Sequence, residues 1–166
     1  GTFSTKTKQE LEGRSWPNGC HVAEVEIDPE TGQVRLDRYT SVDDVGNAVN
    51  PMIVEGQIHG GIASGLGQAV LERPVYDEAG QLLTGSYMDY ALPRADDLPP
   101  LSGSLFEGVP CLTNPLGAKG TGEIGAVAGP PAIVYAVLDA LREYGINQID
   151  MPLYPQKIWE ALNSSG

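Results

Sequence analysis

The sequence predicts an α+β fold, in which hairpins and further strands form a mixed β-sheet and two main helices pack on one side of it. Two observations predict this class. Near the N-terminus a turn sequence separates two stretches with strand patterns, and two stretches with strong helix signals begin at Pro51 and Pro130. The chain has 166 residues, of which 41% are apolar, so it is long enough for one domain with its own core.

The first 18 residues differ from the rest. Residues 1–18 are polar and have no clear period, which predicts an arm or connector before a folded domain at 19–166. A half-buried strand is predicted over 20–28, because Glu24 and Glu26 fall on one face of it.

A tight turn is predicted over 28–32, where Pro presets φ and Gly can take a positive φ. A second strand follows over 33–45, so the pair forms a hairpin. Asp43 and Asp44 at its end could be paired catalytic carboxylates, but we favour a solvated turn.

A helix is predicted over 51–73, with Asn50 as its N-cap and Pro51 at its first position. Five glycines inside it would each cost about 0.5–1 kcal/mol relative to Ala, so something must compensate. Two interpretations stay open: the smooth faces pack closely against another backbone, or they accept a flat ligand beside Gln57, which we favour. These glycines are Gly56, Gly60, Gly61, Gly65 and Gly67.

The remaining elements follow from turn and helix signals. They are a second hairpin at 74–77 and 81–84, an extended segment at 86–98, a strand at 101–108, a helix at 130–144 capped by Gly145, a strand at 146–151, a helix at 156–162 and a frayed tail at 163–166.

A glycine-rich loop is predicted over 117–129, immediately before the Pro130 helix. It holds five glycines, one cation, Lys119, and one carboxylate, Glu123. Without Cβ atoms, the backbone N–H groups can approach a ligand closely. Burial of Glu123 would raise its pKa toward the range of a general base, whereas a solvated Glu123 would leave a plain turn.

Charge and composition exclude some classes of partner. The net charge is −12 and no basic run occurs, which argues against nucleic acid and against an anionic membrane surface. We also expect every apolar run to fall short of a bilayer span. Two separated cysteines and the lack of a signal-peptide pattern predict reduced thiols and a cytoplasmic location.

Several motifs together resemble the molybdenum hydroxylases, the family of xanthine dehydrogenase, aldehyde oxidase and the aerobic carbon monoxide dehydrogenase large subunits. The match runs in the family's order from about Gly19 to Leu162 and is to the C-terminal part of the molybdopterin-binding large subunit. The motifs are Val54–Gly61 with Gly65–Gly67, Lys119–Glu123, and Pro130-Pro131-Ala132 before a helix, supported by 28–32, Asn50-Pro51 and Tyr90–Pro93.

The resemblance implies roles for several residues. Glu123 corresponds to the family's active-site base, which takes the proton from a molybdenum-bound hydroxyl. The residues implied to contact the pterin or its phosphate are Asn50, Gln57, Lys119, Gly120, Thr121 and Gly122. No side chain of this chain is expected to ligate the metal.

The resemblance also implies the wider setting of the site. The cofactor would be molybdopterin as the cytosine dinucleotide, and the reaction an oxidative hydroxylation of an aldehyde, an N-heterocycle or CO. The partners would be the remainder of the large subunit, iron–sulfur and FAD subunits or domains, and a small-molecule substrate.

Two alternatives remain beside this interpretation. The chain could be an isolated folded domain without activity of its own, because it supplies only one wall of a site. It could also be a nucleotide-binding module that uses the 117–129 loop, although the P-loop pattern is missing.

Overall fold

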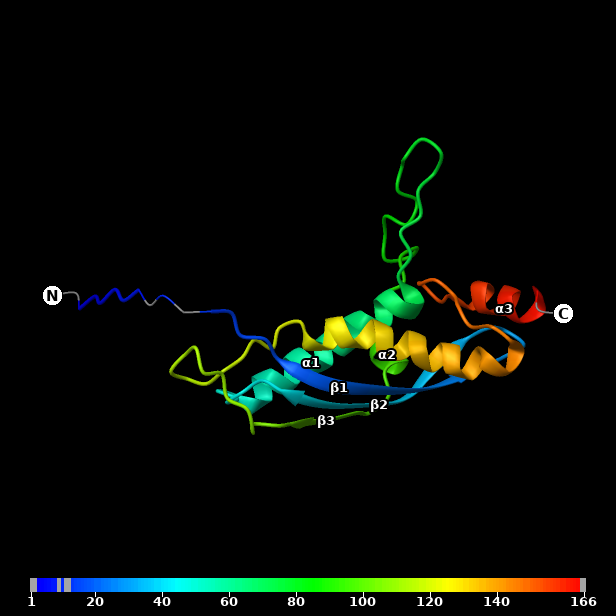
Figure 1. The fold of residues 1–166 in the computed structure, drawn as a ribbon. Helices are drawn as coiled ribbons and strands as arrows, with labels where there is room; N and C mark the ends of the chain where they lie inside the picture. The colour runs from blue at the N-terminus through cyan, green and yellow to red at the C-terminus, as the bar shows by residue number, and fades with distance from the viewer. Residues whose placement is uncertain (1–2, 9, 11–12, 165–166) are drawn as a thin grey trace.

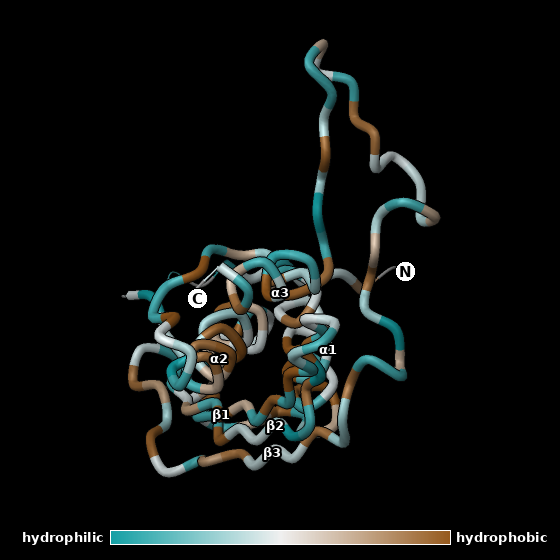
Figure 2. Tube along the Cα trace, turned by 90° about the vertical axis from the view of Figure 1, so that its right-hand side faces the viewer, coloured by the Kyte–Doolittle hydropathy of each residue, from teal (hydrophilic) through white to brown (hydrophobic). Residues whose placement is uncertain are grey.

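The chain folds into two layers, with helices α1 and α2 over one face of a three-stranded sheet (Figures 1 and 2). The structure is a computed structural model that describes residues 3–8, 10 and 13–164. This arrangement confirms the predicted α+β class. The elements are β1 (Asn18–Ile27), β2 (Val34–Asp44), α1 (Pro51–Leu66), a π-helical turn (Gly67–Leu71), a 3-10 turn (Ala95–Asp97), β3 (Leu101–Leu105), α2 (Ile124–Leu141), a 3-10 turn (Arg142–Tyr144) and α3 (Pro155–Ser164).

The sheet is mixed, as predicted, with the strand order β1-β2-β3. Strands β1 and β2 form the predicted antiparallel hairpin, which bulges between Glu24 and Val25. Strand β3 pairs with β2 in parallel, so it reaches the sheet by a long crossover through α1. The inner face of β2 carries Leu36 and Tyr39, which are 4% and 0% exposed.

Helix α1 begins as predicted, since the side chain of Asn50 accepts a hydrogen bond from the N–H of Ile53 at 3.2 Å. The α-helix ends at Leu66 and continues only as the π-helical turn to Leu71, so the predicted end at residue 73 is slightly too late.

The glycines of α1 fall into two groups. A Cβ on Gly61 would lie 2.7 Å from the backbone nitrogen of Ala126 in α2, and one on Gly65 would lie 3.0 Å from the Cα of Gly129. Gly56 and Gly60 have open space where a Cβ would point. Close backbone packing therefore accounts for one group of glycines and not for the other.

Helix α2 begins six residues earlier than predicted, at Ile124 instead of Pro130. Pro130 lies inside the helix, and the glycine-rich stretch is a loop only as far as Glu123. Gly125 shows the physical reason, because its Cβ would lie 2.4 Å from the carbonyl oxygen of Ile58. The tight contact with α1 stabilises helical backbone that glycine and proline would otherwise disfavour.

The predicted 146–151 strand is wrong: this segment pairs with no strand, and just after it the Leu153 N–H donates to the Ala69 carbonyl at 2.7 Å. The second hairpin reduces to a single bridge, Tyr76 with Leu82, on an arm that projects from the body (Figure 1). Gly145 has the predicted positive φ of 77° after the helix. Residues 163 and 164 belong to α3 instead of fraying, and residues 165–166 lie outside the described residues.

One helical stretch in the described residues, Ile124–Tyr144, is long and apolar enough to cross a membrane by length and composition alone. This corrects the expectation that every apolar run is too short. The inner side of this stretch is used within the fold, because Ile133 and Val137 are fully buried in the core beside α1 and the sheet.

Candidate functional site

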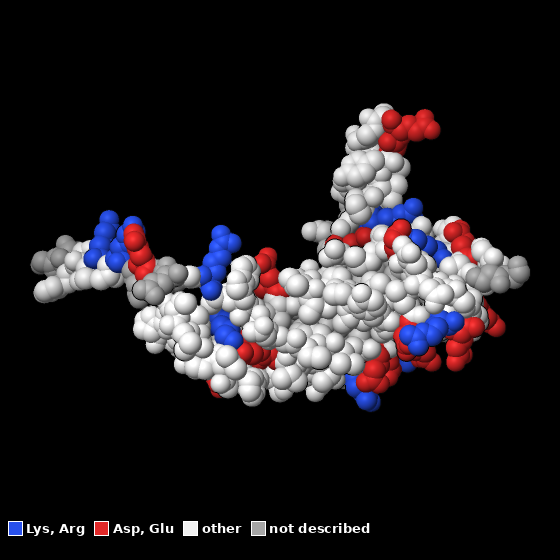
Figure 3. Space-filling view, viewed as in Figure 1, with Lys and Arg blue, Asp and Glu red and all other residues white. Residues whose placement is uncertain are grey.

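A hollow of about 530 Å³ opens at the end of the molecule where α2 begins. It is bounded by the segment before β1, the first residues of β1, the loop before α2, and the first turn of α2. Figure 3 shows that the middle of the neighbouring face, over α2 and β1, carries few charged side chains. The lining residues include Trp16, Asn18, His21, Gly120, Thr121, Gly122, Glu123 and Val127.

The loop before α2 presents bare backbone to this hollow. Gly120 and Gly122 are exposed, and a Cβ on either would meet nothing within 4 Å. Between them the hydroxyl oxygen of Thr121 is buried and has no hydrogen-bond partner. The loop therefore has an exposed backbone and an unpaired hydroxyl group next to the hollow. Both suit a ligand that carries hydrogen-bond donors and acceptors.

Glu123 lies at the end of this loop, directly before the first residue of α2. Its side chain makes no capping hydrogen bond, and no other described residue forms a hydrogen bond or ion pair with its carboxylate. The residue is exposed. This chain alone therefore does not bury the Glu123 carboxylate.

Lys119 precedes the loop and points the other way, into the protein. Its ammonium nitrogen lies 2.6 Å from a carboxylate oxygen of Asp44, and the two side chains are 7% and 10% exposed. The second Asp44 oxygen accepts from the N–H of Gly46 at 2.8 Å. These contacts, with the hydrogen bond from Lys119 first, lower the pKa of Asp44 below its usual range.

Asp43, next to it, is fully buried, so the predicted solvated turn at 43–44 is wrong. One Asp43 oxygen lies 2.9 Å from Nε2 of His21, whose Nδ1 lies 2.9 Å from the hydroxyl of Tyr39. Burial, and then the charge of Asp43, raise the pKa of Tyr39 well above its usual range. These two contacts engage both ring nitrogens of His21, and the other, buried oxygen of Asp43 has no hydrogen-bond partner.

The other predicted site residues separate from one another. Asn50 and Lys119 line a second hollow of about 290 Å³, and Thr121 borders both hollows. Gln57 is exposed on α1 beside the open Gly56 and lines neither hollow.

Sequence reasoning missed several residues of the larger hollow. Trp16 and Asn18 lie in the stretch predicted to be an arm, and His21 lies in the first predicted strand. A single tryptophan in a polar stretch was the one available signal. The proposed boundary between residues 18 and 19 stays a prediction.

Comparison with known proteins bears on what this site binds. The family model described as "Molybdopterin cofactor-binding domain" matches residues 1–99, which is more than half of the chain. The chain belongs to the molybdopterin cofactor-binding domain family. Membership confirms the resemblance to the molybdenum hydroxylases that the motifs indicated.

Relatives of this molybdopterin cofactor-binding domain are large chains of oxidoreductases. The domain is 42% identical to the nicotine 6-hydroxylase large subunit of Paenarthrobacter nicotinovorans, a match that covers 87% of this chain and 18% of that one. It is 36% identical to the carbon monoxide dehydrogenase large chain of Hydrogenophaga pseudoflava, over 89% of this chain and 18% of the relative. The chain thus spans about a fifth of the relatives it matches.

Solved structures agree with this assignment. Quinoline 2-oxidoreductase from Pseudomonas putida 86 superposes with a TM-score of 0.85 at 41% identity, over 89% of this chain and 19% of that one. A Cu,Mo-CO dehydrogenase superposes with a TM-score of 0.86 at 35% identity, over 90% of this chain and 19% of that one.

The residues present fit part of a molybdopterin site. The bare backbone at Gly120 and Gly122 and the unpaired hydroxyl of Thr121 offer donors and acceptors to a polar, flat group. Asn50 uses its side-chain oxygen as a helix cap, which leaves its amide N–H groups for a ligand. The ammonium group of Lys119 fits less well, because Asp44 already holds it.

Proposed function

We propose that this domain forms one wall of the active site of a molybdopterin-dependent hydroxylase or dehydrogenase, with Glu123 as the general base. The observation that carries the proposal is the position of Glu123. Glu123 lines the larger hollow, between the bare glycine backbone and the first turn of α2, and its side chain makes no capping hydrogen bond. Family membership and the relatives' names support the reaction class.

The chain's own residues divide the work. When bound, molybdopterin supplies the metal and the electron-accepting chemistry of the reaction. Gly120, Thr121 and Gly122 bind and orient the cofactor through their backbone and the Thr121 hydroxyl. Asn50 and Gln57 offer amide groups from α1, and the backbone of Lys119 holds the loop in place. We propose that no side chain of this domain ligates the metal.

Glu123 accepts a proton from the oxygen nucleophile that attacks the substrate carbon. In this chain its carboxylate is exposed, and the remainder of the large subunit would cover it. That cover would exclude water from the carboxylate and enclose the reacting groups. The mechanism therefore needs the opposite wall of the site.

We propose an N-heteroaromatic compound as the substrate, ahead of an aldehyde or CO. Two relatives support this order: one is named a nicotine 6-hydroxylase and is 42% identical, and the other is a quinoline 2-oxidoreductase at 41% identity. The apolar lining from Trp16, Ile124 and Val127 suits an aromatic ring.

The wider assembly is also a proposal. Relatives include a "dehydrogenase complex subunit gamma" and chains called large. We propose that this domain works with the remainder of a large subunit and with iron–sulfur and FAD subunits or domains, with molybdopterin held as the cytosine dinucleotide. Two free thiols, Cys20 and Cys111, suit a cytoplasmic location.

The test is Glu123→Gln in the complete enzyme, assayed with nicotine, quinoline, hypoxanthine, an aldehyde and CO. Loss of the base should lower kcat by about 10²–10⁴-fold while molybdenum content stays unchanged. Glu143→Gln is the matched control, because Glu143 is an exposed glutamate just beyond the opposite end of α2. A near-normal rate for Glu123→Gln would refute the proposed base, and the panel decides the substrate class.

A further inference from the structure

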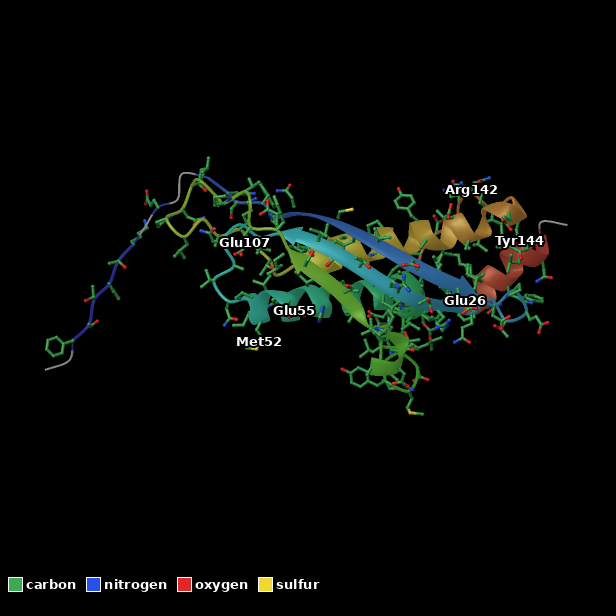
Figure 4. The ribbon with its side chains drawn as sticks, turned by 90° about the horizontal axis from the view of Figure 1, so that it is seen from below. Glu26, Met52, Glu55, Glu107, Arg142 and Tyr144 are labelled. Carbon is green, nitrogen blue, oxygen red and sulfur yellow. The ribbon has the colours of Figure 1, made fainter. Side chains whose placement is uncertain are left out.

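The segment that leads into the loop is fixed to the end of β2 by a dense set of hydrogen bonds. The Lys119 N–H donates to the carbonyl of Val45 at 2.7 Å. The carbonyl of Gly117 accepts from the N–H groups of Asn47 and Cys111 at 3.0 and 2.9 Å. Figure 4 shows Glu107 at this end of the sheet, where its carboxylate accepts from the N–H of Ala48 at 2.8 Å.

Two glycines make this contact as close as it is. Gly46 and Gly117 have φ values of 65° and 67°, a region that favours glycine. A Cβ on Gly46 would lie 2.1 Å from the carbonyl oxygen of Gly117. The two backbones are therefore in close contact here, and a side chain at position 46 would prevent that contact.

The Asp44–Lys119 ion pair lies beside this contact, since a Cβ on Gly46 would be 3.3 Å from Cγ of Lys119. Both side chains are at least nine-tenths buried, and Asp44 also binds the N–H of Gly46. The pair thus joins Asp44, the last residue of β2, to Lys119, the residue directly before the open glycine loop. A buried charge that loses its partner is strongly unfavourable, so neither group can leave without the other.

Lys119 is the last residue of the segment that these hydrogen bonds and the ion pair hold in place. Gly120 and Gly122 meet nothing where a Cβ would be, and the Thr121 hydroxyl has no partner. Glu123 follows at once, so only three residues separate its carboxylate from the ion pair. On the other side Glu123 is fixed by α2, since its carbonyl accepts from the N–H of Val127 at 2.9 Å.

We propose that Asp44 and Lys119 are positioning residues: their buried ion pair sets the path of residues 120–122 and thereby the place of the Glu123 carboxylate. The charge of Lys119 serves Asp44 and not a ligand. As far as catalysis is concerned, this inference rests on the proposed role of Glu123.

The test uses Asp44→Asn, which keeps the side-chain shape, together with Lys119→Met and Lys119→Arg. Lys157→Met is the matched control, because Lys157 donates to the Asp150 backbone carbonyl on α3's side of the molecule and touches none of these residues. Amide hydrogen exchange of residues 117–119, whose N–H groups donate hydrogen bonds, is measured in the 166-residue chain by mass spectrometry, with no ligand added. Steady-state kinetics are measured in the complete enzyme at equal molybdenum content, with the best substrate of the panel.

We expect Asp44→Asn and Lys119→Met to speed exchange over 117–119 by about tenfold or more, because these N–H groups are hydrogen-bonded, while exchange in α3 and in the core of α2 stays unchanged. In the enzyme, kcat should fall at least about tenfold with little change in KM, because the base is displaced and not the binding surface. Lys119→Arg should restore most of both properties, and Lys157→Met should change neither.

Unchanged exchange over 117–119 in both Asp44→Asn and Lys119→Met would overturn the proposal, as would a kcat equal to that of Lys157→Met. The results distinguish the proposed base role of Glu123 from the proposed positioning role of Asp44 and Lys119. If Glu123→Gln keeps its rate while Lys119→Met loosens the loop, the base is wrong and the ion pair still positions the loop. If Glu123→Gln lowers kcat while residues 117–119 of Lys119→Met keep their protection from amide exchange, only the positioning role is wrong.

Discussion

The Asp44 carboxylate is held by two donors, the ammonium group of Lys119 and the N–H of Gly46. Both favour its charged form, which is why the pKa of Asp44 lies below its ordinary value. Glu123 has no such donors among the described residues. The two carboxylates therefore differ in their surroundings: Asp44 is held by two donors, and Glu123 has none among the described residues.

The lowered pKa of Asp44 predicts a pH dependence of stability. Its folded pKa lies below the unfolded value of about 3.9, so its contribution is complete above that value and is lost as the pH falls through the folded pKa. We expect the difference in unfolding free energy between the native chain and Asp44→Asn to be constant above about pH 5 and to shrink below about pH 4.

Urea denaturation of both chains from neutral to acid pH measures this difference. Comparing the two chains cancels the titration of the other carboxylates, which act in both. A difference that stays constant throughout the acid range would show that Asp44 is not stabilised as an anion.

Helices α1 and α2 pack against each other through direct backbone contact. Gly61 and Gly65 of α1 face Gly125 and Gly129 of α2, and a Cβ at Gly61 would lie 2.8 Å from the Cα of Gly125. This closeness sets the position of the first turn of α2, and with it the position of Glu123.

Two glycines on the same helix should therefore respond in opposite directions to alanine. Gly61→Ala should destabilise the chain by about 1–3 kcal/mol, because the added methyl group strikes the backbone of α2. Gly56→Ala should stabilise it by about 0.5–1 kcal/mol, because its Cβ points into open space and alanine favours the helix. Thermal or urea denaturation checks both, and equal effects would contradict the glycine contact.

At the scale of the whole molecule, the chain leaves much apolar surface uncovered. Met88 and Tyr87 on the projecting arm are 93% and 83% exposed, and Leu112 is 93% exposed (arm in Figures 1 and 2). Exposed apolar surface of this extent is typical of regions that are covered by other protein. The chain spans about a fifth of its relatives' length, which also fits the interpretation that other protein covers this surface.

The isolated chain should consequently bind molybdopterin weakly and show no turnover. It offers one wall, and an open half-site neither encloses a cofactor nor excludes water. Elemental analysis of the purified 166-residue chain should find molybdenum far below one atom per chain. A stoichiometric content would show that this wall alone suffices, and would contradict the prediction.

Local patterns were enough for the hairpin, the N-cap at Asn50, the last helix and the class of fold. They failed where a contact with a residue far away in the sequence determines the secondary structure. Pro130 looks like a helix start because proline favours that position, yet packing against Gly61 extends α2 back to Ile124. The 146–151 segment has strand-like residues, but strands need a partner, and no described strand lies beside it.

The sequence by itself determined that this chain has an α+β domain of a molybdopterin-binding family and that Glu123 stands on a glycine-rich loop. Those properties lie in short-range patterns and in motif order, which need no knowledge of contacts. Only the tertiary structure decided that Lys119 faces Asp44, 75 positions away, and that Asp43 is buried against His21. The reason is physical: the partner of a charged group is set by which segments the fold brings together, and no local pattern encodes that choice.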